Sequence, residues 1–229
     1  MRRRLVLFDI DGTLLSAGGI SARALEAALV ETFGTAGPAA GYDYSGKTDP
    51  QIVRELMRGA GLDNGAIEAL RPVALERYAR RLAEWIRPEH VRPKPGVLEL
   101  LESLAGENGV RLGLLTGNLE PCARLKLEPI AANRFFGFGA YGSDDEDRYR
   151  LPAVALARAR EATGIAFAGE DTVIVGDSVH DVRCGRALGV RAVAVSTGWT
   201  SAAALAGAGP DALVGDFSDT AAARRAILG

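Results

Sequence analysis

The sequence predicts an α/β protein with a doubly wound parallel sheet and an inserted all-helical domain. Three short apolar runs support this prediction, because each is typical of a strand buried on both faces. They lie within residues 5–11, 110–118 and 171–181, and each ends in polar residues. Segments with helical spacing separate them, and strands that alternate with helices form parallel sheets with right-handed crossovers.

The first run, residues 5–15, reads L-V-L-F-D-I-D-G-T-L-L. Side chains alternate along an extended chain, so Asp9 and Asp11 leave the end of this strand on the same side. Two acids at a buried strand end are unfavourable, because burial and like charge both raise the pKa of a carboxyl group. Taken alone, the motif is also compatible with a surface turn whose acids point into water.

The segment that follows has only helical patterns, and no strand is expected between residues 16 and 90. Its apolar residues recur at helical spacing and are typical of a packed core. The expected helices run from a Ser21 cap to about Phe33, from an Asp49 cap with Pro50 as the first helical residue, and over residues 66–86.

Segments with glycine or proline flank this helical block at residues 16–19 and 93–96. Such segments are typical of linkers and hinges. We therefore expect a core domain made of residues 1–15 and 93–229, and a helical cap domain of residues 16–92.

The remainder of the chain alternates between helical and strand patterns, as a Rossmann-like core requires. Expected helices cover residues 97–105, about 120–131 and 152–163, and further expected strands cover residues 138–141, 190–195 and 212–214.

Composition excludes several classes of function. The 229 residues include 24% charged residues with a net charge of −2, which is not the footprint of a nucleic-acid-binding protein. After Arg2 to Arg4 only four apolar residues precede Asp9, too few for a signal peptide, and no run reaches membrane-spanning length. Cys122 and Cys184 are too few for a disulfide framework, so we expect a cytoplasmic protein.

Polar groups end all three buried strands: Asp9 and Asp11, then Thr116, then Asp177 with Asp181 one helical turn beyond. In open parallel sheets, ligands bind beyond the carboxyl ends of the strands. Four carboxylates in one pocket require a cation, and oxygen ligands without nearby histidine or cysteine favour Mg²⁺. Mg²⁺ beside a hydroxyl and a strand-to-helix turn indicates phosphoryl transfer.

The motifs D-I-D-G-T-L-L, L-L-T-G-N and V-G-D-S-V-H-D, in this order, resemble those of the haloacid dehalogenase (HAD) superfamily. Within this superfamily the sequence resembles the phosphatase branch with a helical cap, and it is similar to phosphoglycolate phosphatases. It covers nearly the whole chain, including G-P-D-A-L-V-G-D at residues 209–216.

The resemblance implies a role for each acid. Asp9 would be the nucleophile that forms an aspartyl-phosphate, and Asp11 the general acid and then the general base. Mg²⁺ would be bound by the carboxylates of Asp9 and Asp177 and by the backbone carbonyl of Asp11. Asp181 would act through water or anchor the other ligands.

The same resemblance implies a phosphate-binding turn, in which Thr116 and the N–H of Gly117 hold phosphate oxygens. Asn118 would assist them or cap the next helix. Lys47, Thr48 and Asp49 lie in a loop that the family often folds over the active site. Lys47 would then contact an anionic substrate; the alternative is an ordinary helix start with Lys47 in water.

One motif departs from the family pattern. The family usually has a lysine, often in K-P-x-P, shortly before the third strand, but here the sequence reads D-R-Y-R-L-P. Arg148 or Arg150 would replace its charge, and we favour Arg148 because it falls in the loop before the helix that Pro152 begins. Lys126 is another candidate, with a solvent-exposed helical lysine as the alternative.

We therefore expect a Mg²⁺-dependent phosphatase that hydrolyses a small phosphorylated metabolite. The closest alternative is a phosphomutase of the β-phosphoglucomutase type, which would use the same carboxylates behind a water-excluding cap. The other is a catalytically degenerate member that binds phosphate or a protein. No nucleic acid or membrane partner is expected, and the chain is a monomer or a homodimer.

Overall fold

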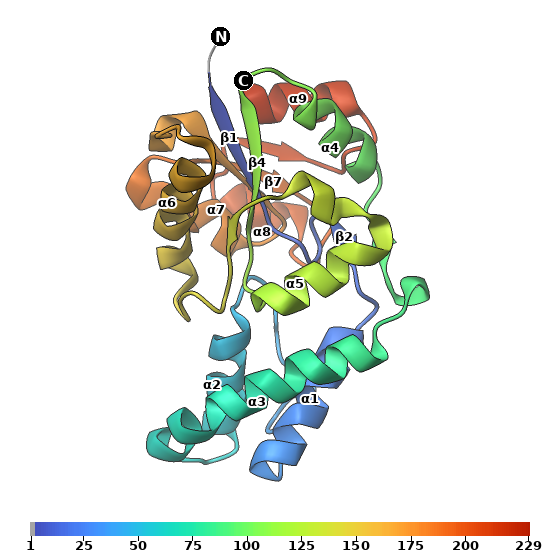
Figure 1. The fold of residues 1–229 in the computed structure, drawn as a ribbon, viewed down its shortest axis with the longest axis vertical. Helices are drawn as coiled ribbons and strands as arrows, with labels where there is room; N and C mark the ends of the chain where they lie inside the picture. Colours follow the sequence, from blue (N-terminus) through green and yellow to red (C-terminus); the bar gives the residue numbers. More distant parts are fainter. Residues whose placement is uncertain (1–2) are drawn as a thin grey trace.

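The computed structural model describes residues 3–229, and a six-stranded parallel sheet lies at its centre (Figure 1). The strand order is β5-β4-β1-β6-β7-β8, with β1 between β4 and β6. This order confirms the predicted doubly wound sheet. From one edge to the other, the strands are β5 (Gly139–Ala140), β4 (Val110–Leu115), β1 (Arg4–Phe8), β6 (Thr172–Gly176), β7 (Arg191–Val195) and β8 (Ala212–Val214).

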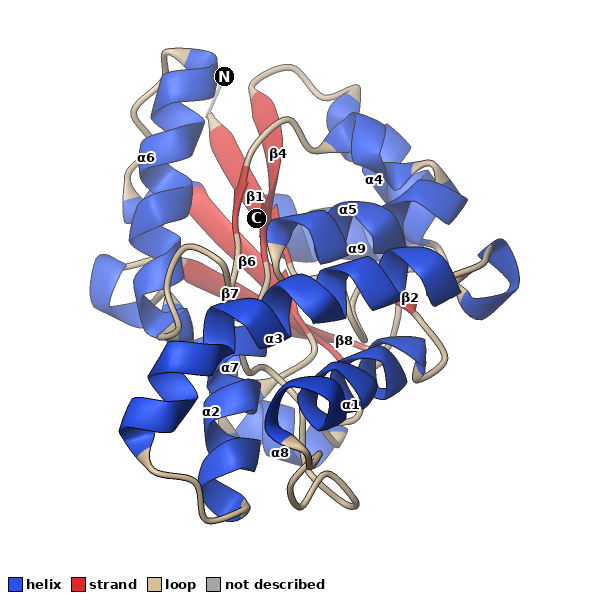
Figure 2. Cartoon of the chain, turned by 60° about the horizontal axis from the view of Figure 1, so that its bottom comes forward, coloured by secondary structure: helices blue, strands red, loops and turns tan. Residues whose placement is uncertain are grey.

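Helices cover both faces of the sheet (Figure 2). All five residues of β1 are buried, and its side chains alternate between two clusters. Val6 and Phe8 belong to the larger cluster, and Leu5 and Leu7 to the smaller one. Helices α4 (Val97–Ala105), α5 (Glu120–Leu127) and α9 (Thr220–Leu228) supply residues to the first cluster, α6 (Leu151–Thr163) and α7 (Val179–Cys184) to the second, and α8 (Ala202–Gly207) packs beside α7.

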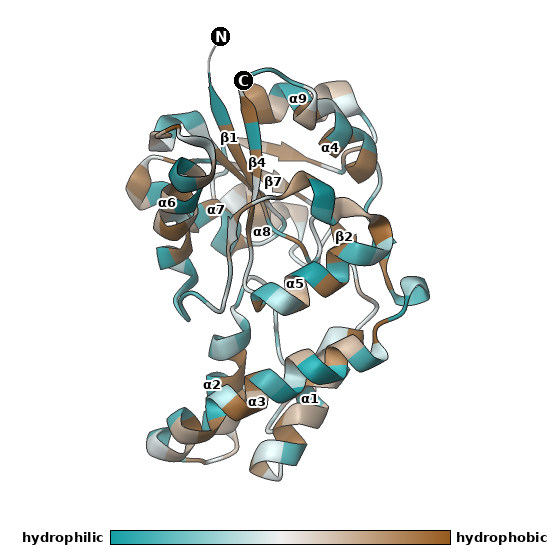
Figure 3. Cartoon of the chain, viewed as in Figure 1, coloured by the Kyte–Doolittle hydropathy of each residue, from teal (hydrophilic) through white to brown (hydrophobic). Residues whose placement is uncertain are grey.

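Three helices form a separate layer at the carboxyl ends of the strands, in the lower part of Figure 1. We call α1 (Ile20–Phe33), α2 (Asp49–Gly59) and α3 (Asn64–Trp85) the cap helices. Their apolar sides pack together, with Leu29, Val53 and Leu82 fully buried. In Figure 3 brown hydrophobic colour gathers on the strands, while the cap helices also carry teal hydrophilic residues.

Two short strands lie where the chain passes between the core and the cap helices. β2 (Leu15–Ser16) pairs antiparallel with β3 (Arg92–Pro93), where only irregular linkers were expected. The two chain segments that connect the cap helices to the remainder of the protein therefore lie side by side. Short 3₁₀ helices complete the structure at Pro88–His90, Glu128–Ile130, Ala132–Phe135, Arg148–Arg150, Gly169–Asp171 and Arg186–Leu188. Within residues 3–229 no helix has the length and apolar character needed to span a bilayer.

Two predicted helix caps are wrong. Helix α1 begins at Ile20 with Gly19 at the cap position, so Ser21 lies inside the first turn and does not cap it. Helix α2 is capped by Thr48, whose hydroxyl accepts from the backbone N–H of Gln51 at 3.2 Å. Asp49 is the first helical residue, and its carboxylate accepts a hydrogen bond from the backbone N–H of Leu119 and does not cap the helix.

We expect Gly96→Ala to destabilise the protein strongly. Gly96 has φ +74° at the start of α4, and an added Cβ would lie 2.0 Å from the carbonyl oxygen of Phe217. The left-handed backbone alone costs about 1–2 kcal/mol with a side chain, and the overlap adds to this. The urea midpoint should fall clearly. Gly106→Ala is the control, since Gly106 has φ −75° and its nearest neighbour would be at 3.5 Å; equal midpoints would contradict the prediction.

Candidate active site

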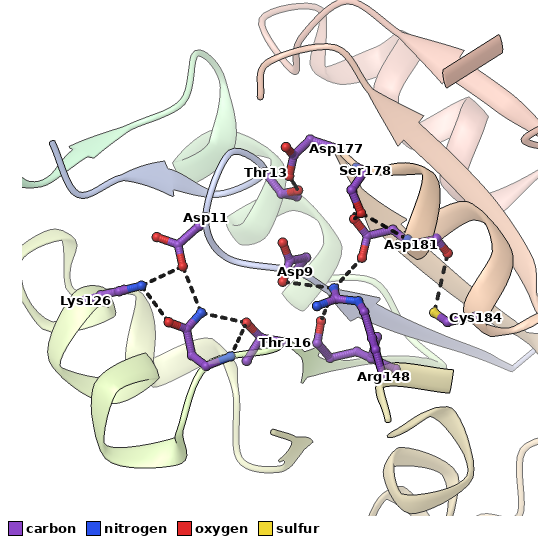
Figure 4. Close-up of polar contacts among 12 residues, drawn as sticks. Asp9, Asp11, Thr13, Thr116, Lys126, Arg148, Asp177, Ser178, Asp181 and Cys184 are labelled. Atoms are coloured by element: carbon purple, nitrogen blue, oxygen red, sulfur yellow. Dashed lines mark hydrogen bonds and ion pairs between the residues drawn. The ribbon is translucent and has the colours of Figure 1, made fainter. Parts of the chain in front are cut away.

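The polar strand ends meet beyond the carboxyl edge of the sheet (Figure 4). Asp9 follows β1 directly, Thr116 follows β4, and Asp177 follows β6. Because β1 lies between β4 and β6, these three groups come together. All three residues are buried, so Asp9 does not point into water as a surface turn would require, whereas the side chain of Asp11 is 43% exposed.

Three carboxylates form a buried cluster. Oxygen atoms of Asp9, Asp177 and Asp181 all lie within 4.8 Å of one another. The hydroxyl of Thr13 donates to Asp177 at 2.8 Å. Asp181 is fixed by Ser178, whose hydroxyl donates to it at 2.6 Å and whose backbone N–H donates at 3.0 Å. Among the described residues, this cluster does not include the carboxylate of Asp11.

Burial raises the pKa of Asp9 and of Asp177. The pKa of Asp9 rises to about 7, chiefly through desolvation, with Arg148 opposing and Asp181 adding to the rise. Burial and the charge of Asp9 likewise raise the pKa of Asp177 well above its usual value. A pocket that holds these acids ionised therefore needs positive charge beyond Arg148, and the all-oxygen donor set fits Mg²⁺.

Arg148 is a basic side chain beside Asp9. It is 3% exposed, its Nη2 lies 3.2 Å from Asp9 Oδ1, and it forms an ion pair with Asp181. The side chain of Arg150 is instead 72% exposed and pairs with Asp145 at 3.4 Å. The structure thus places Arg148 beside Asp9 and Arg150 away from it.

Lys126 is also buried, so its interpretation as a solvent-exposed helical lysine is wrong. Its Nζ lies 2.6 Å from Asp11 Oδ2 and 2.5 Å from Asn118 Oδ1. Burial opposes its charge, but the carboxylates of Asp11 and Asp49 outweigh this and raise the pKa of Lys126. Lys126 therefore stays charged and forms an ion pair with Asp11, while Arg148 forms one with Asp9.

Asn118 does not cap the following helix, because Leu119 occupies the cap position of α5. Its Nδ2 donates to Asp11 Oδ2 at 2.8 Å and to Thr116 Oγ1 at 2.8 Å. The amide thus links the end of β4 to the loop after β1, and the alternative of a capping role is wrong.

Asp49 lies in the loop expected over the site, but the sequence suggested only a helix-capping role for its carboxylate. Its carboxylate accepts from the backbone N–H of Leu119 at 2.7 Å, and its own N–H donates to the carbonyl of Gly117 at 2.8 Å. Burial raises its pKa to about 6, with Lys126 opposing the rise. An Asp before a proline is typical of a helix cap, so no local pattern indicated this long-range contact.

The two other residues of this loop point to different places. Thr48 is fully buried, and its hydroxyl donates to the carbonyl of Glu146 at 2.7 Å. It does not line the cavity, so a substrate contact by Thr48 is not supported. Lys47 does line the cavity, and its Nζ lies 2.7 Å from Glu55 Oε2.

A cavity of about 710 Å³ lies between the sheet and the cap helices. The core side contributes Asp9, Asp11, Thr116, Gly117 and Arg148, and the cap side contributes residues of α1 and of the loop before α2. The fold and site together define an α/β enzyme whose acidic centre is closed by a helical layer.

Known proteins place this enzyme in a family. A family model described as haloacid dehalogenase-like hydrolase matches residues 6–195. A phosphoglycolate phosphatase from Pseudomonas syringae pv. tomato is 29% identical over 218 residues, covering 93% of this chain and 77% of the relative. The chain therefore belongs to the haloacid dehalogenase-like hydrolase family.

Solved structures agree in fold. A haloacid dehalogenase-like family hydrolase from Streptococcus pneumoniae has a TM-score of 0.67 at 19% identity, covering 97% of this chain and 98% of that one. A predicted phosphoglycolate phosphatase from Haemophilus somnus has a TM-score of 0.71 at 20% identity, with the same coverage. The fold expected from the sequence resemblance is thus confirmed.

We expect the protein in chelator to lose stability as the pH rises. The pKa of Asp9 is about 7 in the folded chain against an ordinary 3.8, so the folded state binds a proton that the unfolded state releases between these values. Stability from this group is full below the unfolded pKa and lost as the pH rises through the folded pKa, and Asp177 acts in the same direction.

The melting temperature in chelator should therefore fall between about pH 5 and pH 8, and Asp177→Asn should flatten the fall. Asp216→Asn is the control, because Asp216 is exposed and, within residues 3–229, its carboxylate accepts only from the nearby backbone N–H of Ser218, at 2.8 Å. Parallel curves for wild type and Asp177→Asn would contradict the assignment.

Proposed function

We propose that this hydrolase is a Mg²⁺-dependent phosphatase that cleaves a small phosphomonoester through an aspartyl-phosphate on Asp9. The main support is the position of Asp9: its carboxylate lines the cavity, beside Arg148 and within the acidic cluster. Curated relatives named phosphoglycolate phosphatase support the phosphatase class.

The residues present fit a magnesium ion. The carboxylates of Asp9 and Asp177 and the backbone carbonyl of Asp11 would hold it, with Asp181 anchored beside them by Ser178. When bound there, Mg²⁺ would supply positive charge that offsets the charge of the phosphoryl group.

In the first step, a carboxylate oxygen of Asp9 attacks phosphorus and the bond to the leaving oxygen breaks. Asp11 gives that oxygen its proton, so the product leaves as an alcohol. Lys126 and Asn118 both bond Asp11 at Oδ2, and within residues 3–229 no hydrogen bond to Oδ1 occurs, so Oδ1 remains for proton transfer.

The phosphate would be held by the turn after β4. Thr116 and the N–H of Gly117 would bind its oxygens, and Arg148 would neutralise charge on Asp9 and the phosphoryl group. Gly117 also packs closely on the loop before α2, because an added Cβ would lie 2.0 Å from the carbonyl oxygen of Lys47.

In the second step, Asp11 removes a proton from water as the water attacks phosphorus. The bond between phosphorus and Asp9 breaks, inorganic phosphate leaves, and both carboxyl groups return to their starting forms. Arg148 is ion-paired to Asp9 in the free site and would stabilise the carboxylate as it is released.

We further infer a small phosphorylated metabolite as substrate, a cytoplasmic location and a monomer or homodimer. The buried, unpaired thiols of Cys122 and Cys184 support a reducing compartment.

The test is release of inorganic phosphate from a panel of small phosphomonoesters, with Mg²⁺ and with chelator. Metal-dependent turnover without added bisphosphate supports the phosphatase. Turnover only in the presence of a sugar bisphosphate would indicate a phosphomutase, and no turnover on any ester would indicate a protein that only binds phosphate or a partner.

A further inference from the structure

The side of the cavity formed by the cap helices identifies the class of alcohol that leaves. We propose, resting on the phosphatase function above, that the leaving group is an uncharged polyol or sugar and not an alcohol bearing a carboxylate. We call this side the leaving-group pocket, and it is lined by Ser21, Leu25, Tyr42, Tyr44, Lys47 and Ile52.

The only basic side chain of the leaving-group pocket is neutralised inside the cap. Lys47 Nζ lies 2.7 Å from Glu55 Oε2, 3.0 Å from the hydroxyl of Tyr42, and 4.2 Å from the centre of the Tyr42 ring. A substrate carboxylate here would have to displace Glu55 or lie beside it, and like charges brought together in an interface are strongly unfavourable.

Glu55 is itself held firmly in its ionised form. The hydroxyl of Tyr42 donates to Oε2 at 2.7 Å, and Gln51 Nε2 donates to Oε1 at 2.8 Å. Burial opposes ionisation, but the hydrogen bonds of Lys47 and Tyr42 outweigh it and lower the pKa of Glu55. The pair of Lys47 and Glu55 therefore presents no net charge to a substrate.

The other basic side chains of the cavity belong to its core side. Lys126 pairs with Asp11, and Arg148 with Asp9. Lys94 Nζ donates to the carbonyl of Thr197 at 2.6 Å and, within residues 3–229, forms no ion pair. Lys94 is thus the one cation that would serve a substrate carboxylate, and it provides a control for the test.

Hydroxyl groups and carbon surface make up the remainder of the leaving-group pocket. Ser21 Oγ is buried and makes no hydrogen bond within the described residues, and buried hydroxyls are normally paired. Ser21 lines the cavity, so a rotation of its side chain would let a hydroxyl of the substrate supply the missing partner. Leu25 and Ile52 offer apolar contact to the carbon chain.

The size of the cavity supports a leaving group larger than two carbons. Its volume of about 710 Å³ lies in the range of pockets that enclose drug-sized ligands. Phosphate with a two-carbon acid would fill a small part of this space, whereas a phosphorylated polyol or sugar would fill more of it.

The first experiment compares two esters that differ only at the far end. Glycerol 3-phosphate ends in a hydroxymethyl group where 3-phosphoglycerate has a carboxylate. We expect kcat/KM to favour glycerol 3-phosphate by about tenfold or more. Glu55→Gln should shift this ratio about tenfold toward 3-phosphoglycerate, because it frees the charge of Lys47.

The matched control is Glu68→Gln, which removes a cap carboxylate that pairs with Arg54 and Arg71 and does not line the cavity. The ratio should stay at the wild-type value in this variant. An unchanged ratio in Glu55→Gln would overturn the proposal.

A second experiment tests the hydroxyl of Ser21. Ser21→Ala should lower kcat/KM for glycerol 3-phosphate about tenfold and leave propyl phosphate unchanged, because only the first ester has hydroxyls to bond. Equal losses on both esters would show a packing effect and would contradict the role of Ser21.

The outcomes separate this inference from the proposed function. Phosphate release that strongly favours 3-phosphoglycerate or phosphoglycolate would overturn the inference alone, and loss of that preference in Lys94→Met would identify Lys94 as the carboxylate-binding cation. Release from none of the esters would contradict the phosphatase function, and the inference with it.

Discussion

Asp9→Asn should abolish release of inorganic phosphate, with kcat reduced by about ten-thousandfold or more. An amide is a poor nucleophile and cannot form the aspartyl-phosphate. No neighbouring acid can substitute, because Asp177 accepts from Thr13 at 2.8 Å and Asp181 is fixed by Ser178. The measurement is a phosphate assay under saturating Mg²⁺ with the best ester of the panel.

The fold should survive this substitution, since Asn has nearly the same shape and removes one charge from a crowded acidic cluster. The melting temperature in chelator is therefore expected to equal or exceed that of wild type, which shows that lost activity is chemical. Substantial turnover by purified Asp9→Asn would require a different nucleophile and would reject the covalent mechanism.

Arg148→Met should cause the second large loss, both of stability and of activity. The guanidinium is 3% exposed and pairs with Asp9 and Asp181 through one nitrogen, Nη2. Removing one partner of a buried ion pair costs about 3–5 kcal/mol, because the remaining charge is left unpaired. We expect kcat to fall about a hundredfold or more, since positive charge beside the transferring phosphoryl group is lost.

Two other variants sharpen this prediction. Arg148→Lys keeps a charge and a donor at the position where one Arg148 nitrogen bonds both acids, so it should recover most of the activity. Arg150→Met is the control, because its side chain is 72% exposed and lies outside the cavity. Similar losses in Arg148→Met and Arg150→Met would show that the charge beside Asp9 is not the cause.

Much of the core was predictable because its information is local. Buried parallel strands read as continuous apolar runs, and the residue at which each run ends identifies Asp9, Thr116 and Asp177. Helix α4 was expected over residues 97–105 and spans Val97–Ala105. Since parallel strands end at one edge of a sheet, their polar ends converge whatever the detailed packing.

The contacts between the cap helices and the core were not predictable in the same way. Helical spacing identifies the apolar face of α5, but it does not indicate that the side chain of Lys126 contacts Asp11. Asp49 and Thr48 both resemble helix caps in the sequence, which indicates neither the bond from Leu119 to Asp49 nor the bond from Thr48 to Glu146. Such contacts depend on how two folded layers meet, which a single sequence pattern does not encode.

The hydrogen bond between Asp49 N–H and the Gly117 carbonyl has a thermodynamic consequence. The peptide group after Thr116 is part of the turn assigned to phosphate, and the peptide that follows it accepts from the first residue of α2. Phosphate binding at this turn and the docking of α2 against it are therefore thermodynamically coupled. If bound phosphate favours the docked position of α2, the docked position favours phosphate binding by the same free energy. A phosphate analogue should thus protect the amide hydrogens near Asp49 from exchange, although they belong to the opposite layer of the molecule.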